Sequence, residues 1–215
     1  GIQMNKKESF RYIKMSADRG ETLSMLKYGD MLLENNGNRQ EAAHYYKMSA
    51  DQGNVMAMES YGDMLFNGKG IMVDKFEASK YYKMAADQGD VNSQFKYGKM
   101  LFVGDCIEKN TKEAFFYLKK SADKGVVSSM FLLSLYFEDL NDCDSELFYL
   151  KLAAENGNNE ALLKLGIVFR DGLLKCNVDM CLAAAYFKSA AFKGNPQAMF
   201  EYAMLLMDGI GVQKN

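Results

Sequence analysis

The sequence contains no tryptophan, one proline and one histidine among 215 residues. Because proline breaks helices, its near absence favours many helices, and the 18 glycines can supply the turns between them. A single histidine allows no repeated Cys/His or Ser/His pair and leaves a metal site without its commonest ligands. His44 stands at a variable position of the repeat described below, so we interpret it as an ordinary exposed side chain.

The chain also lacks an excess of charge and a long apolar run. Its net charge is −2, from 26 basic and 28 acidic residues, so it has no basic character that would favour nonspecific nucleic-acid binding. No apolar stretch reaches the roughly 18–20 residues that a membrane span needs, and no signal-peptide pattern opens the sequence. We therefore expect no nucleic-acid partner and no membrane insertion by this segment.

Cysteine is scarce, and its spacing fits neither a CxxC pair nor a zinc site. The four cysteines are Cys106, Cys143, Cys176 and Cys181. We expect free thiols, because no basic cluster that would lower their pKa is evident, and this pattern favours a reducing, cytoplasmic location. One alternative is that the first three, which fall in loops of consecutive repeats, lie along one edge within reach of a redox partner.

What the sequence has instead is an internal repeat whose register is set by one glycine. The intervals between these glycines are 33, 36, 36, 32 and 37 residues. In every repeat an alanine lies three residues before the glycine, a lysine six before and a tyrosine eight before. Such periodic self-similarity is the signature of a helical repeat array. The closing glycines are Gly20, Gly53, Gly89, Gly125, Gly157 and Gly194.

Each repeat is predicted to contain two helices. Counting onward from the closing glycine, position 4 is small, position 9 is glycine except for Ser134 and Ala203, and position 12 is leucine or phenylalanine. Offsets of four, eight and twelve share one helix face, so this segment is helix A. The Tyr–Lys–Ala segment before the next glycine, for example residues 77–86, is helix B.

The repeat pattern also predicts what several residue types do. The closing glycine is expected in a left-handed turn after helix B, and the position-9 glycine is expected to allow close contact between helices, because it otherwise costs about 1 kcal/mol in a helix. Methionines and tyrosine pairs are interpreted as core. Within helix B, five of the six lysines that lie six before the closing glycine are expected to pair with an acidic residue four later on a solvated face, namely Asp18, Asp51, Asp87, Asp123 or Glu155. In helix A, positions 4, 8, 9 and 12 are expected to be buried and positions 5, 6 and 11 partly buried.

The repeat resembles the Sel-one-like repeats, close relatives of tetratricopeptide repeats. The segment 54–89 carries the family pattern in Ala57, Tyr61-Gly62, Leu65, Gly68-Lys69-Gly70, Asp74, Ala78, Tyr81-Tyr82, Ala85-Ala86 and Gly89. The resemblance implies an all-α fold: a right-handed α-α superhelix of antiparallel helix pairs, with helix A lining the concave groove. Segment 126–157 departs most, with Ser134 for glycine, Glu146 for alanine and a short loop at 139–144.

The resemblance covers the whole chain. It divides the array into a lone helix B, five helix A–helix B repeats and a lone helix A with a loop: 1–20, 21–53, 54–89, 90–125, 126–157, 158–194 and 195–215. Neither end shows the polar capping repeat that a solenoid needs. We therefore hypothesise an excerpt of a longer array; a parent reading frame that ends at these same residues would refute this. We expect a monomer in isolation, with end-to-end contacts through the uncapped termini as the alternative.

Positions 7, 10 and 14 of helix A are expected to face the groove. Most are mixed polar, but Leu132, Leu135 and Ile167 are apolar and lie near Lys96, Lys99 and Lys164. Apolar side chains rimmed by charge favour a docking site for a peptide or helix. The alternative is that the irregular fourth repeat is rotated, so that Leu132 and Leu135 belong to the core.

These observations predict a non-catalytic scaffold or adaptor that binds a protein or peptide along its groove, with no cofactor and no metal. Two alternatives differ in class. A nucleic-acid-binding helical repeat would need a polar code with basic phosphate contacts, whereas the groove mixes acidic and basic residues. A hydrolase, which the resemblance to cysteine-rich members suggests, would need a nucleophile–base pair in a pocket, and the sequence offers none.

Overall fold

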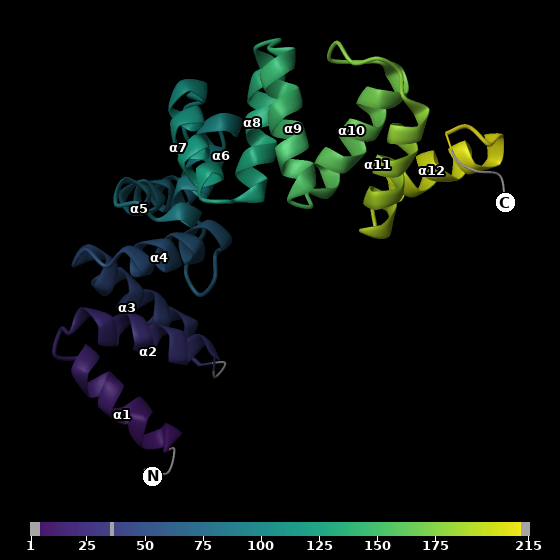
Figure 1. The fold of residues 1–215 in the computed structure, drawn as a ribbon. Helices are drawn as coiled ribbons and strands as arrows, with labels where there is room; N and C mark the ends of the chain where they lie inside the picture. The colour runs from purple at the N-terminus through teal and green to yellow at the C-terminus, as the bar shows by residue number, and fades with distance from the viewer. Residues whose placement is uncertain (1–4, 35–36, 212–215) are drawn as a thin grey trace. The chain divides into compact units, whose positions relative to one another are not determined.

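The fold is given by a computed structural model, which describes residues 5–34 and 37–211. Over these ranges the chain forms twelve α-helices and no β-strand, so the predicted all-α class is confirmed. Helix B segments alternate with helix A segments along the chain (Figure 1). The helices are α1 (Lys6–Ala17), α2 (Thr22–Glu34), α3 (Arg39–Asp51), α4 (Val55–Asn67), α5 (Lys75–Asp87), α6 (Val91–Val103), α7 (Thr111–Asp123), α8 (Val127–Asp139), α9 (Cys143–Glu155), α10 (Asn159–Asp171), α11 (Met180–Phe192) and α12 (Pro196–Asp208).

The chain divides into two compact parts, residues 1–117 and 118–215, with the boundary inside α7. In the first part each helix from α1 to α6 packs against the next one in the chain. In the second part α8 to α12 pack in the same sequential way. Helices α2, α4 and α10 therefore each pack against a helix B on either side, so that a wide face of each is covered.

Local signals in the sequence explain where the helices begin and end. The closing glycines all have a positive φ, between 87° and 94°, which confirms the predicted left-handed turn after helix B. Most helices begin at an Asn or Asp whose side chain accepts a hydrogen bond from the backbone of the first turn, such as Asn54 and Asp74. Four helix A segments (α4, α6, α10 and α12) end at a further left-handed glycine.

Three of the position-9 glycines, Gly29, Gly62 and Gly166, lie against an aromatic ring of the following helix B. A Cβ added to Gly62 would lie 2.8 Å from Tyr82 Cε1, and one added to Gly166 would lie 2.5 Å from Phe187. The predicted close helix contact is thus confirmed, and its cause is the ring seven residues before the next closing glycine. In segment 126–157 that ring position is Leu150, and the glycine position is Ser134. Leucine also stands at this position opposite Gly98, as Leu118, so the size of the neighbour alone does not explain the serine.

Helix A is more deeply buried than its pattern alone indicates. Position 5 was predicted to be partly buried, yet Met25, Met58, Gln94, Met130 and Leu162 there are at most 6% exposed. The reason is that position 5 contacts helices B on both sides. Met58 Sδ of α4 accepts a hydrogen bond from Gln88, the C-cap of the following helix α5, whereas Gln94 of α6 donates to Ala86 O of α5, which precedes it. At position 5 of α12, Met199 is 48% exposed, and the structure describes no helix B after it.

Candidate functional site

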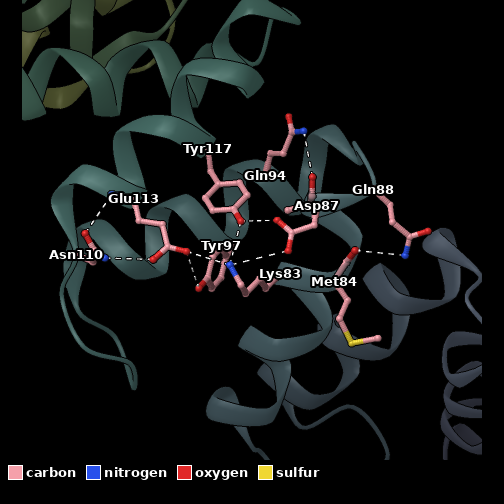
Figure 2. Close-up of polar contacts among 10 residues, drawn as sticks. Lys83, Met84, Asp87, Gln88, Gln94, Tyr97, Asn110, Glu113 and Tyr117 are labelled. Atoms are coloured by element: carbon pink, nitrogen blue, oxygen red, sulfur yellow. Dashed lines mark hydrogen bonds and ion pairs between the residues drawn. The ribbon is translucent and has the colours of Figure 1, made fainter.

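The helix B surface of the first part is occupied by polar groups that join successive repeats (Figure 2). Lys83 Nζ of α5 lies 3.0 Å from Glu113 Oε1 and 3.1 Å from Tyr117 Oη, both on α7. Tyr117 donates to Asp87 Oδ1 at 2.5 Å. Desolvation acts to lower the pKa of Lys83, but its hydrogen bonds to Tyr117 and Glu113 outweigh this, so the pKa is raised. These groups are therefore hydrogen-bonded to one another, and they connect the helices B of successive repeats.

The same joint recurs along residues 5–117. The tyrosine eight before each closing glycine donates to the acidic residue at the end of the preceding helix B: Tyr45 to Asp18, Tyr81 to Asp51 at 2.9 Å and Tyr117 to Asp87. Three of the five predicted pairs within one helix B form, namely Lys47–Asp51, Lys83–Asp87 and Lys119–Asp123. Lys14 differs, because its contact of 3.0 Å is with Glu41 of the next helix B.

A cavity of about 350 Å³ lies between α4 and α6. Its lining includes five of the predicted groove positions, namely Asp63 and Asn67 of α4 with Lys96, Lys99 and Val103 of α6. The apolar part of the lining comes from side chains that the sequence did not single out as site residues: Phe66, Tyr82, Phe95 and Met100. We call this hollow the α4–α6 cavity.

The charges around the α4–α6 cavity are mostly paired. Lys96 Nζ donates to Asp63 at 2.6 Å and to Glu59 at 2.9 Å. Burial acts to lower the pKa of Lys96, but these hydrogen bonds prevail and raise it, so the ammonium stays charged. Lys75 pairs with Asp105 at 2.9 Å. Lys99 is exposed at the rim, and within the described part of the chain no carboxylate lies within ion-pair distance of it.

The other predicted site residues lie in the second part. Leu132 and Leu135 of α8 are partly buried, so the docking and core interpretations both stay open. Lys164 and Ile167 of α10 line a different hollow, of about 330 Å³. Lys164 pairs there with Glu138 at 2.6 Å. The six predicted partner-binding residues thus lie on three helices, two on each. That they form a single binding site remains a prediction.

The side chains that could bind a metal or act as a nucleophile do not form a cluster in the described residues. No cluster of three or more His, Cys, Asp or Glu that could hold a metal is found in the residues that the structure describes. Cys106 and Cys181 are exposed, Cys143 and Cys176 are partly buried, and all four are free thiols. His44 is exposed. None of the helices over 5–34 and 37–211 has the length and apolar character to cross a membrane.

Alternating helices A and B with glycine turns and close A–B contacts define a helical-repeat solenoid protein. The Sel1 repeat family model matches residues 23–54, 55–90, 91–126, 147–158, 159–195 and 196–215, and the chain belongs to this family. Sel1 repeat proteins generally mediate protein–protein interaction and are generally non-catalytic scaffolds. Residues 1–22 and 127–146 are not matched, and the second of these stretches covers α8 and the start of α9, within the segment that departs most from the repeat pattern.

Solved structures agree on the fold. The protein c5321, a protective antigen present in uropathogenic Escherichia coli strains, superposes with a TM-score of 0.82 at 23% identity, over 96% of this chain and 46% of that one. A Sel1 repeat protein from Oxalobacter formigenes gives a TM-score of 0.74 at 24% identity, over 94% and 90% of the two chains. The chain thus spans less than half of the E. coli protein. No curated protein matches the sequence.

Proposed function

We propose that this chain is a non-catalytic interaction scaffold, and that the α4–α6 cavity receives an apolar side chain of a protein or peptide partner. The observation that carries the proposal is the cavity itself. Phe66, Phe95 and Met100 supply apolar walls, while Lys99 and Asn67 stand at a polar rim. Apolar hollows with a polar rim are where interfaces concentrate their binding energy.

Two further features support a partner that is a polypeptide. Val103 is 59% exposed at the cavity, so it offers apolar area that a partner would cover. Lys96 is held by two carboxylates and packs 5.4 Å from the centre of the Tyr82 ring, so the wall is rigid before binding. A preorganised wall lowers the entropic cost of association.

The test is a selection of peptides from a random library displayed on phage, followed by binding measurements on two matched variants. Val103→Asp places a charge at the cavity, whereas Met84→Asp changes a residue that is 44% exposed on helix α5 of the same part. We expect the selected peptides to lose at least about tenfold in affinity for V103D and to keep their affinity for M84D. Peptides that tolerate V103D and fail on M84D would move the binding surface to helix B.

A further inference from the structure

Helix α9 carries a charge where four other helices B carry a buried alanine. Eleven residues before the closing glycine stand Ala42, Ala78, Ala114 and Ala183, each fully buried. In α9 this position is Glu146, which is 6% exposed. Four helices of the same chain therefore pack with a methyl group there. A carboxylate at this depth costs free energy unless it is paired.

Glu146 is incompletely paired within the described residues. Its nearest cation is Lys164 Nζ, 3.9 Å from Oε1, which is beyond hydrogen-bond length. The same ammonium lies 2.6 Å from Glu138 Oε2 and donates to it. Burial raises the pKa of Glu146, the positive charge of Lys164 opposes that rise, and the negative charge of Glu138 reinforces it. The carboxylate thus lacks a close partner of its own.

Glu146 lines the hollow of about 330 Å³ in the second part. Glu138 and Lys164 line it as well, so two carboxylates face one ammonium, and the site has an excess of one negative charge. Beside them lie Ile167, Val168, Leu173 and Leu174, which give the hollow apolar walls. A buried acid with apolar walls is complementary to a cation on an alkyl stem.

We propose that this hollow binds the basic side chain, lysine or arginine, of a partner polypeptide, with Glu146 as its buried ion-pair partner. The four-residue-shorter loop of this repeat, at 139–144, brings Asn141 and Cys143 to the hollow. Ile167 and Leu174 sheathe the stem, and Glu138 adds a second acceptor. The inference rests on the proposed function, because the occupant belongs to a protein partner, but it concerns a separate site.

The experiment uses amino-acid amides as probes, so its failure leaves the test of the α4–α6 cavity standing. N-acetyl-lysine methylamide, the arginine analogue and the neutral norleucine analogue are titrated into the whole chain labelled with ¹³C at the glutamate carboxyl carbon. We expect the two basic probes, and not norleucine, to shift the Glu146 signal, with at least about tenfold tighter binding.

Four variants test whether charge in the hollow sets this preference. Glu146→Gln should abolish it and Glu138→Gln should weaken it, whereas Lys164→Gln should strengthen it by removing the competing ammonium. Glu155→Gln, on an exposed residue of the same helix, should leave it unchanged. Because the K164Q effect is opposite in sign, general loss of structure would not produce this pattern.

Two outcomes would overturn the proposal. One is equal binding of the basic and norleucine probes, which would make the hollow a nonspecific apolar site. The other is a Glu146 shift with Ca²⁺ alone and none with either basic probe, which would indicate a cation site of a different kind. Wild-type spectra that respond to the basic probes while E146Q spectra do not would support it.

Discussion

The two parts of the molecule pack the same repeat around aromatic rings in two different ways. In residues 5–117, position 8 of helix A is a tyrosine and position 12 a leucine; in residues 118–171, position 8 is a leucine and position 12 a phenylalanine. The tyrosine of the following helix B meets Tyr61 edge to face, at 88°, in the first part. In the second part it stacks on Phe137 or Phe169 at 7°.

The difference shows that each of these helices A has one aromatic ring facing helix B, but that the ring can stand at position 8 or at position 12. Positions 8 and 12 are about one helical turn apart, so moving the ring by one turn keeps it on the interface with helix B. The polar consequence differs, however. Tyr81 donates to Asp51, whereas among the described residues the side chain of Tyr149 makes no hydrogen bond to Asp123, the residue at the equivalent position.

The largest effect is expected where the first part has Gly62 against Tyr82 and the second has Ser134 against Leu150. Gly62→Ser should lower the free energy of unfolding by about 2–3 kcal/mol, because an added Cβ overlaps the ring. Adding Tyr82→Leu, which copies the second part, should restore part of that loss. Urea denaturation measures both; a double variant no more stable than G62S would contradict the account.

A second prediction converts one packing mode into the other. Tyr61→Leu and Leu65→Phe should each cost about 1–2 kcal/mol alone, through lost contact or overpacking. Together they should cost less than their sum by about 1 kcal/mol, because the ring has only moved by one turn. A double-mutant cycle in urea provides the coupling energy. If the two losses of stability add without a coupling energy, a ring at position 12 does not replace a ring at position 8.

The third prediction separates the hydrogen bond from the ring. Tyr81→Phe should destabilise the protein by about 1 kcal/mol, because it removes the bond to Asp51 and leaves the ring in place. Burial and the bond to Asp51 raise the pKa of Tyr81 to about 12. Tyr186→Phe is the matched control and should change the melting temperature little, because burial and the charge of Glu155, rather than a hydrogen bond, act on the Tyr186 hydroxyl. Equal losses in the two variants would mean that the hydroxyl contributes in both parts.

The smallest effect concerns pH. Burial raises the pKa of Glu146 above its ordinary value, with Lys164 opposing and Glu138 reinforcing the shift. Near and below pH 4 the carboxyl is protonated in both states and carries no ionisation cost. As the pH rises from the ordinary glutamate pKa to the raised pKa, the unfolded chain releases this proton before the folded state does, so stability falls, and the loss is complete above the raised pKa. Glu146→Gln should therefore gain up to about 1 kcal/mol over the wild type at pH 7 and little at pH 4.

Much of the fold follows from the repeat pattern. The tyrosine, lysine, alanine and glycine offsets locate helix B and its left-handed turn, because each offset is a local requirement of helix geometry. The burial of position 5 in helix A was underestimated, since it depends on helices on both sides. The contact of Lys14 with Glu41 was also missed, because it joins residues 27 apart in the sequence.

The candidate sites were predictable only in part. Positions 7, 10 and 14 of helix A were predicted to face the groove. Among the residues at these positions, Lys96 and Lys99 line the α4–α6 cavity. Of its aromatic walls, Tyr82 was interpreted as core and Phe95 was expected to be partly buried, and nothing in the spacing marks either one, or Phe66, as the wall of a cavity. Glu146 could have been identified from the sequence, because it is the one acidic residue at a repeat position where four other repeats have alanine. Its lack of a close partner could be seen only when Lys164 had been placed.

The sequence by itself determined the helix pairs, their order, their turns and the family, because these depend on periodicity and on backbone conformations that glycine adopts at low cost. Only the tertiary structure decided where hollows form, which lysine meets which carboxylate, and whether a tyrosine ring packs edge-on or stacks. Those features depend on distances between side chains of different helices. Such distances are set by the packing of whole helices rather than by any local run of residues.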